Sequence, residues 1–251
     1  MTEQPPACSS PSPAGRVAFF GGSFDPPHLG HLAVARAARD ALHLERVMFA
    51  PVGAQPLKPH GSTAPFPDRV AMTSLAIADE RAFEISLVDA PAPGNQPNYS
   101  LETLRTLRAG LPPSGSLFCL MGADSFLSLR RWRGAAEIPF IASLIVASRP
   151  GQRLDDLARF IPPGLTLIPS PGEAVEAAAN PSIELRSLCL RNPAGQTAPF
   201  FVLPGLDVEI SASDIRAQVR SSPQDPSAAR LLPAPVTEYI RTHRLYQQRR
   251  P

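Results

Sequence analysis

The sequence has few cysteines, little net charge and no long hydrophobic run. The cysteines at 8, 119 and 189 form no Cys-x-x-Cys pair, which argues against a zinc site and a disulfide framework. A net charge of +2 gives no global field for nucleic acid. The longest apolar run, residues 139–147, is too short to span a membrane, and the N-terminus lacks the pattern of a secretory signal. We therefore expect a cytoplasmic protein that binds neither nucleic acid nor a membrane.

What the sequence does contain is a strand, turn and helix pattern near its start. Residues 17–22 form a short apolar run that ends in Gly21 and Gly22, and a His-x-Gly-His sequence then opens a segment with helical apolar spacing. Glycines let the backbone turn and let a ligand approach it, and a helix start offers free N–H groups. His28 and His31 can there donate hydrogen bonds or carry charge toward an anion. The pattern predicts a nucleotide-phosphate site in an α/β fold, rather than a plain corner with surface histidines.

The rest of the chain predicts one domain with a tail. Residues 1–14 are rich in Pro, Ser and Ala, and we expect them to be disordered. A strand at 46–52 completes a parallel β-α-β unit with the first strand and helix. Residues 15–251 are interpreted as a single domain, in which 162–206 forms an irregular insertion without an evident role.

Three stretches resemble known motifs. GGSFDPPHLGH (21–31) resembles the (H/T)-x-G-H nucleotidyltransferases and is most similar to the bacterial nicotinate-nucleotide adenylyltransferase family. GADSFLSLRRW (122–132) matches that family's Gly-x-Asp-Ser…Trp spacing. ISASDIR (210–216) resembles its Ile-Ser-x-(Ser/Thr)-x-x-Arg element, with Ala212 in place of the usual serine. The resemblance implies an α/β fold, namely a Rossmann-like, doubly wound parallel sheet with helices on both faces, followed by C-terminal helices.

The same resemblance implies a reaction and its substrates. The family transfers AMP from ATP to nicotinate mononucleotide, which gives nicotinate adenine dinucleotide and pyrophosphate in NAD biosynthesis. His28 and His31 would be the catalytic residues. The residues implied in ATP binding are Gly21, Gly22, Ser23, Phe24, His28, His31, Lys58, Ser211, Ser213 and Arg216. We expect Mg²⁺ to arrive with ATP and predict no metal ligands in the protein.

The acceptor side is implied by a second set of residues. Nicotinate mononucleotide would bind to Tyr99, Ser100, Gly122, Asp124, Trp132 and Arg149. Taken alone, several of these have plainer interpretations: Ser100 and Asp124 are suited to helix capping, and Arg149 to bracing a loop. In the loop that carries Lys58, Leu57 replaces the family's histidine, and His60 is the candidate substitute.

Two other functions fit the same motifs. One is a sister nucleotidyltransferase that uses nicotinamide mononucleotide, pantetheine phosphate or a cytidylyl acceptor. The other is a nucleotide sensor without catalysis, which the presence of His28, His31 and Arg216 disfavours. A homo-oligomer is compatible with the sequence. The main hypothesis requires His31 and Arg216 to lie close enough to share one triphosphate.

Overall fold

The computed structural model describes residues 15–58, 61–147, 157–170, 185–203, 210–222 and 226–247. Its strands are β1 (Arg16–Gly22), β2 (Arg46–Pro51), β3 (Phe83–Ile85), β4 (Ser116–Gly122), β5 (Ser143–Ala147), β6 (Thr166–Pro169), β7 (Arg186–Arg191) and β8 (Thr197–Leu203). Its longer helices are α1 (Leu29–Leu42), α2 (Phe66–Ile77), α3 (Ser100–Gly110), α7 (Ala212–Ser221) and α9 (Ala234–Thr242). Its short helices are η1 (Pro93–Asn95), α4 (Ala123–Ser128), η2 (Leu129–Arg131), α5 (Ile138–Ile141) and α8 (Pro226–Ala229).

The strands form an eight-stranded sheet in the order β3-β2-β1-β4-β5-β8-β7-β6. The chain divides into two compact units, each built from separate stretches. The first unit contains the described residues within Met1–Phe20, Arg36–Val47 and Tyr99–Asp207. The second contains those within Gly21–Ala35, Met48–Asn98 and Val208–Pro251. The single domain expected over 15–251 stays a prediction.

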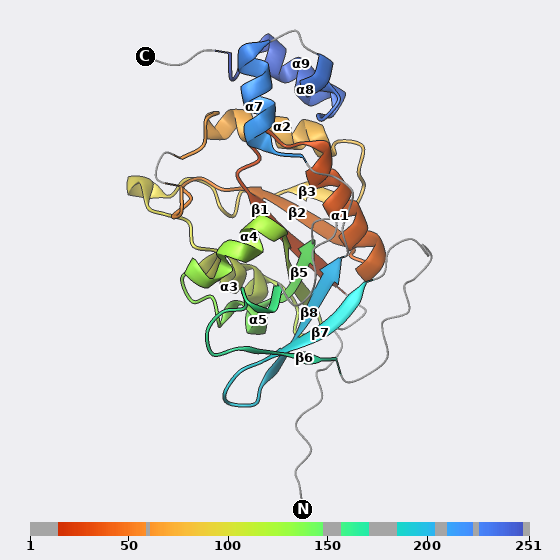
Figure 1. The fold of residues 1–251 in the computed structure, drawn as a ribbon, viewed down its shortest axis with the longest axis vertical. Helices are drawn as coiled ribbons and strands as arrows, with labels where there is room; N and C mark the ends of the chain where they lie inside the picture. The colour runs from red at the N-terminus through yellow and green to blue at the C-terminus, as the bar shows by residue number, and fades with distance from the viewer. Residues whose placement is uncertain are drawn as a thin grey trace, which may run out of the picture. The chain divides into compact units, whose positions relative to one another are not determined.

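Parallel strands make up the core of the first unit. β1, β4, β5 and β8 pair in parallel, and β7 and β6 extend this sheet in the antiparallel sense (Figure 1). The side chains of Phe118, Leu144 and Phe200 are completely buried. Parallel strands covered on both faces are apolar along their whole length, which is why their runs could be recognised in the sequence. The predicted α/β class with a Rossmann-like parallel sheet is confirmed.

The region 162–206 departs from its predicted irregular form. Its described parts contain β6, β7 and β8, and β8 lies next to β5 inside the sheet. Pro199 within β8 concealed this, because proline normally argues against a central strand. The register resolves the conflict: pairing with β5 begins only at Phe200, one residue after the proline. Whether the region is an insertion stays a prediction.

Helices dominate the second unit. α2 and α9 pack together, and Tyr239 of α9 donates a hydrogen bond to Oδ1 of Asp68 in α2 at 2.9 Å. The rings of Phe24 and Phe83 lie on either side of Phe49, with centroid distances of 5.5 and 5.3 Å. These ring contacts connect the turn after β1 to β2 and β3.

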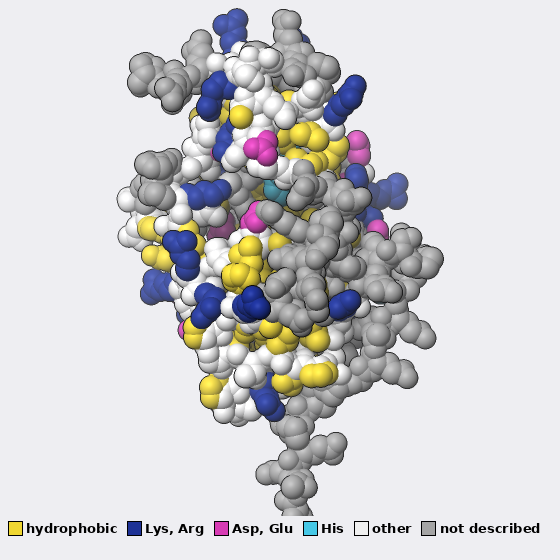
Figure 2. Space-filling model, viewed as in Figure 1, with side chains coloured by type: hydrophobic (Ala, Val, Ile, Leu, Met, Phe, Trp, Pro, Cys, Tyr) yellow, Lys and Arg dark blue, Asp and Glu magenta, His cyan; other side chains and the backbone are white. Residues whose placement is uncertain are grey.

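Several composition-based expectations can be compared with the structure. Among the described residues, no helix has the length and apolar character needed to cross a bilayer. On the face in Figure 2, Lys and Arg side chains are dispersed instead of gathered into one basic patch. Cys119 in β4 and Cys189 in β7 are both buried.

Candidate functional site

The turn that leaves β1 is shaped by its glycine and its buried phenylalanine. A Cβ on Gly22 would lie only 3.2 Å from the ring of Phe24, so the turn fits glycine best there. Phe24 is 1% exposed and contacts the ring of His31, with the two centroids 5.0 Å apart. The Gly22 carbonyl accepts a hydrogen bond from the Val52 N–H at 2.9 Å. The turn is therefore fixed by the packing of the Phe24 ring and by the hydrogen bond from Val52, which follows β2.

The two histidines lie stacked at the start of α1. Their ring centroids are 3.6 Å apart, and the His28 backbone N–H donates to Nδ1 of His31 at 3.1 Å. This bond requires a lone pair on Nδ1, so a neutral His31 carries its proton on Nε2. His28 is 7% exposed, and its Nδ1 has no hydrogen-bond partner within the part of the chain that the structure describes.

Burial keeps both imidazoles uncharged. It lowers the pKa of His28 to about 4. The pKa of His31 lies well below its usual value, first because of burial and second because of the charge that His28 would carry. At neutral pH the uncharged pair therefore offers N–H groups, and not positive charge, to an anion.

Three cationic side chains converge on the Ser23–Asp25 turn. Lys58 Nζ donates to Ser23 Oγ at 2.9 Å, Arg69 Nη1 donates to the Ser23 carbonyl at 2.7 Å, and Arg216 Nη1 donates to the Asp25 carbonyl at 2.7 Å. Burial lowers the pKa of Lys58, and the charge of Arg216 lowers it further, while Asp25 partly offsets both. Such mutual repulsion among cations is relieved when an anion binds.

The Asp25 side chain connects this turn to other segments of the chain through hydrogen bonds. It is 4% exposed, and its two oxygens accept hydrogen bonds from the backbone N–H groups of Thr63 and Ala64 and from the hydroxyl of Tyr246. The Tyr246 bond measures 2.8 Å. Burial raises the pKa of Tyr246, and the negative charge of Asp25 raises it further, so the hydroxyl stays protonated as a donor. One carboxylate thus joins three segments of the second unit.

Helix α7 brings Ser211, Ser213 and Arg216 to this turn. Ser211 is the N-cap of α7, and its Oγ accepts from the Asp214 N–H at 3.5 Å. Ser213 Oγ accepts from Arg216 Nη2 at 3.1 Å, which helps to fix the guanidinium. Buried Ile215 and Val219 hold the opposite side of the helix. His31 contacts Phe24, and Arg216 donates to the carbonyl of the neighbouring Asp25, so both contact the same turn; that they share one triphosphate stays a prediction.

The described residues that are expected to bind the acceptor lie in the first unit; only Arg149 of that set lies outside the described residues. Tyr99 precedes α3 and lies under the Arg133 guanidinium, 5.0 Å from its carbon to the ring centroid. Trp132 is half-buried, and its Nε1 donates to Ser128 Oγ at 3.1 Å. Arg149, and His60 in the Lys58 loop, lie outside the described residues.

Two capping interpretations in this unit are wrong. Ser100 is the first residue of α3, and the N-cap is Tyr99, with no side-chain cap bond. Asp124 lies in the first turn of α4, where its charge favours the helix dipole, but the N-cap is Gly122. Capping motifs predict a helix start to within a residue or two, which is the size of these errors. A Cβ on Gly122 would meet nothing within 4 Å, so this glycine leaves open space at the end of β4.

Sequence reasoning missed three residues of the phosphate-side cluster. The sequence predicted a binding role for none of the three, which are Asp25, Arg69 and Tyr246. Arg69 is 2% exposed, and an arginine buried in a helix has no distinctive spacing in the sequence. The only available signal for Asp25 was its position inside the glycine and histidine motif.

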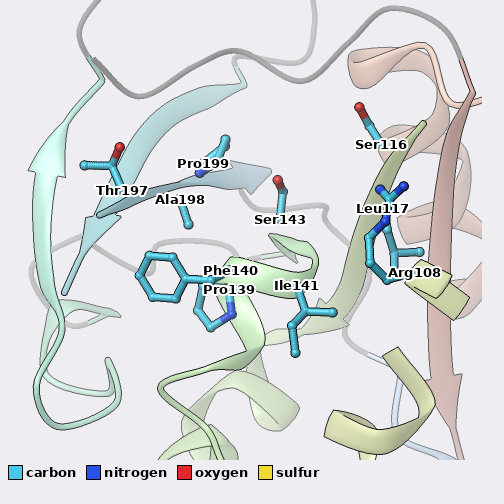
Figure 3. A pocket seen from close by; sticks show the side chains of 10 residues that line it. All are labelled: Arg108, Ser116, Leu117, Pro139, Phe140, Ile141, Ser143, Thr197, Ala198 and Pro199. Atoms are coloured by element: carbon cyan, nitrogen blue, oxygen red, sulfur yellow. The ribbon is translucent and has the colours of Figure 1, made fainter. Parts of the chain in front are cut away.

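The first unit also contains a cavity. Its volume is about 230 Å³, and Figure 3 shows side chains from α5 and from the amino ends of β4, β5 and β8 around it. Ligands of open parallel sheets bind at the opposite, carboxyl ends of the strands. Arg108 in its wall already donates to the carbonyls of Gly115, Leu111 and Pro112. We therefore place the functional site at the β1 turn and not at this cavity.

Comparison with known proteins shows the family of the chain. The model of the cytidylyltransferase-like family matches residues 19–218. A probable nicotinate-nucleotide adenylyltransferase of Pelobacter propionicus is 35% identical over 233 residues, which cover 93% of this chain and 99% of the relative. A relative with the same name from Roseiflexus sp. is 38% identical over 73% of this chain and 87% of its own length.

A solved structure supports the fold. The Plasmodium falciparum nicotinic acid mononucleotide adenylyltransferase, complexed with NaAD, matches with a TM-score of 0.65 at 14% identity, over 92% of this chain and 97% of that chain. At this identity the match speaks for the fold alone. Together with the sequence relatives, which align over most of the length of both chains, the family match leads to one conclusion. The chain belongs to the nicotinate-nucleotide adenylyltransferase family of the cytidylyltransferase-like nucleotidyltransferases.

Proposed function

We propose that this protein transfers AMP from ATP to nicotinate mononucleotide, with release of pyrophosphate and formation of nicotinate adenine dinucleotide. The observation that carries this proposal is the convergence of Lys58, Arg216 and the histidine pair on the Ser23–Asp25 turn. A cluster of cations and N–H donors on one turn is suited to a triphosphate. The family assignment supports the choice of reaction.

The reaction needs positioning and charge stabilisation more than acid–base chemistry. A phosphate oxygen of nicotinate mononucleotide attacks the α-phosphorus of ATP and forms a new P–O bond. The bond from the α-phosphorus to the oxygen that bridges it to the β-phosphorus breaks, and pyrophosphate leaves with the electron pair. Because the attacking phosphate is already ionised, no general base is required.

Each residue of the cluster has a role in this proposal. The N–H groups of His28 and His31 stabilise the charge that develops on the α- and β-phosphates. Lys58 and Arg216 bind the triphosphate as cations. The remaining residues line the same site: Gly21, Gly22, Ser23 and Phe24 in the β1 turn, with Ser211 and Ser213 at the start of α7.

Magnesium enters as part of the substrate, MgATP. Among the described residues, no group of three or more His, Cys, Asp or Glu side chains could hold a metal ion. Asp25, the buried carboxylate of the cluster, is already engaged by two backbone N–H groups and Tyr246. The protein residues therefore do not fit a resident metal, and phosphate oxygens are the natural ligands of the ion.

We assign nicotinate mononucleotide to Tyr99, Ser100, Gly122, Asp124, Trp132 and Arg149. The support is the match of the 122–132 motif and the open space that the described residues leave beside Gly122. Trp132 offers an indole face for a pyridine ring, with its N–H already satisfied by Ser128. We further expect the enzyme to act in the cytoplasm.

A pyrophosphate-release assay across acceptors tests the proposal. Purified protein is given MgATP with nicotinate mononucleotide, nicotinamide mononucleotide or pantetheine phosphate, each at the same concentration. We expect the highest kcat/KM with nicotinate mononucleotide and formation of the dinucleotide by mass spectrometry. A higher kcat/KM with one of the other acceptors would replace the assigned substrate, and ATP binding without any transfer would indicate a sensor.

A further inference from the structure

We infer that Tyr246 and Asp25 form a positioning pair, through which the C-terminal segment holds Arg216 and the Lys58 loop in place for the triphosphate. The inference rests on the proposed function, because it concerns how the ATP side of that site is organised. We assign neither side chain a contact with the substrate. Both act through the residues that do.

The hydrogen bonds around Asp25 support this role. Its side chain receives the Tyr246 hydroxyl at 2.8 Å and the N–H groups of Thr63 and Ala64 at 2.6 and 3.0 Å. Thr63 and Ala64 follow the loop that carries Lys58. The main-chain carbonyl of the same residue receives Arg216 Nη1 at 2.7 Å. Reorientation of the Asp25 side chain would therefore release the segment that follows Lys58 and would move the carboxylate oxygen that lies 3.9 Å from Arg216 Nη1.

Tyr246 is placed to prevent that rotation. It is 6% exposed, and its hydroxyl is bound to a carboxylate oxygen that also accepts the Ala64 N–H. A hydrogen bond to a charged, buried acceptor contributes more than one between neutral groups. Loss of the hydroxyl leaves Asp25 with one donor fewer in a buried setting, so its side chain gains freedom to reorient.

The chain offers a matched control on the same segment. Tyr239 in α9 also donates to an aspartate, with Asp68 Oδ1 at 2.9 Å, and also ties the C-terminal region to the second unit. Within the described part of the chain, Asp68 accepts from Tyr239, whereas Lys58 and Arg216 donate to Ser23 and Asp25. Tyr239→Phe therefore removes the same chemical group without touching the cation cluster.

The test compares Tyr246→Phe and Tyr239→Phe in the full-length protein. We expect Tyr246→Phe to lower kcat/KM for ATP about tenfold, as expected for one hydrogen bond to a charged group, and to leave KM for nicotinate mononucleotide unchanged. Tyr239→Phe should keep both parameters within about twofold of the original protein. Thermal unfolding of both variants is measured, and kinetics are recorded well below both midpoints.

A double-mutant cycle that combines Tyr246→Phe with Arg216→Ala tests whether Tyr246 acts through Arg216. If Tyr246 acts through Arg216, the double variant should be little worse than Arg216→Ala alone. Additive losses, equal effects of the two tyrosine variants, or an unchanged kcat/KM for ATP in Tyr246→Phe would each overturn the inference.

Binding measurements separate this inference from the proposed reaction. The probe is an ATP analogue with a methylene bridge between its α- and β-phosphorus atoms, titrated calorimetrically without acceptor. Tyr246→Phe should weaken its binding several-fold relative to Tyr239→Phe, even if no acceptor in the panel is adenylylated. Equal dissociation constants for the two variants would count against the pair, whatever the acceptor proves to be.

Discussion

Arg216 donates a hydrogen bond to the main-chain carbonyl of Asp25 at 2.7 Å, across 191 positions of the sequence. Its Nη1 also lies 3.9 Å from a carboxylate oxygen of the same residue. The contact joins the start of α7 to the turn after β1, where Phe24 touches His31. Two helix starts of the second unit are thereby brought to one turn, which is the arrangement that a shared triphosphate requires.

Arg216→Ala should lower kcat about 10²–10³-fold, the usual loss for a group that stabilises developing charge. The reason is that Arg216 is one of the cations hydrogen-bonded to the turn, and Ser213 orients its second nitrogen. Steady-state pyrophosphate release at saturating substrates measures the effect. Arg220→Ala is the control, because Arg220 lies exposed in the last turn of the same helix. Similar losses in both variants would point to a general effect of charge.

His31→Ala should reduce kcat by a similar factor, about 10²–10³. The variant removes an N–H donor and also the acceptor of the His28 backbone N–H. Dinucleotide synthesis from ATP and nicotinate mononucleotide is the assay. His243→Ala serves as the comparison, since His243 is exposed at the end of α9. A rate close to that of the original protein would remove His31 from the mechanism.

The sequence predicted the parts of the site that local patterns encode. The β1 turn, the start of α1 and the Ser211 N-cap were recognisable because glycines, histidines and a capping serine act through their immediate neighbours. Asp25, Arg69 and Tyr246 were missed because their roles arise from bonds to distant segments, such as the one from Tyr246 to Asp25. The buried strand β8 was missed because it contains Pro199, and proline argues against a central strand. In the structure the pairing of β8 with β5 begins only after this proline, at Phe200.

Replacement by alanine should lower thermal stability at one glycine and weaken substrate binding at another. In Gly53→Ala the new Cβ would lie 2.5 Å from the backbone nitrogen of Pro91, so we expect a loss of several degrees in the thermal midpoint. In Gly122→Ala the Cβ would meet no protein atom within 4 Å, so the midpoint should barely change. KM for nicotinate mononucleotide should nevertheless rise severalfold in Gly122→Ala, because the methyl group occupies space assigned to that substrate. An unchanged KM would remove Gly122 from the binding site.

The low pKa of His28 makes stability depend on pH with a defined sign. Burial lowers this pKa to about 4, whereas an unfolded chain has a value near 6.5. Between these values the unfolded state binds a proton that the folded state does not, so lowering the pH favours unfolding. The contribution of His28 is complete above about pH 6.5 and is lost as the pH falls toward about 4.

His28→Asn isolates this contribution because asparagine does not titrate. From pH 7 to pH 5, the free energy of unfolding of the original protein should fall by about 2 kcal/mol more than that of His28→Asn, given roughly 1.4 kcal/mol per unit of pKa difference. Urea titrations at the two pH values measure both changes, and the variant's own loss at pH 7 cancels in the comparison. Parallel decreases in the two proteins would mean that His28 takes up its proton in the folded state as readily as in the unfolded chain. Its imidazole would then be a cation near pH 6, and the hydrogen-bond role assigned to it would have to be replaced by a charge-based one.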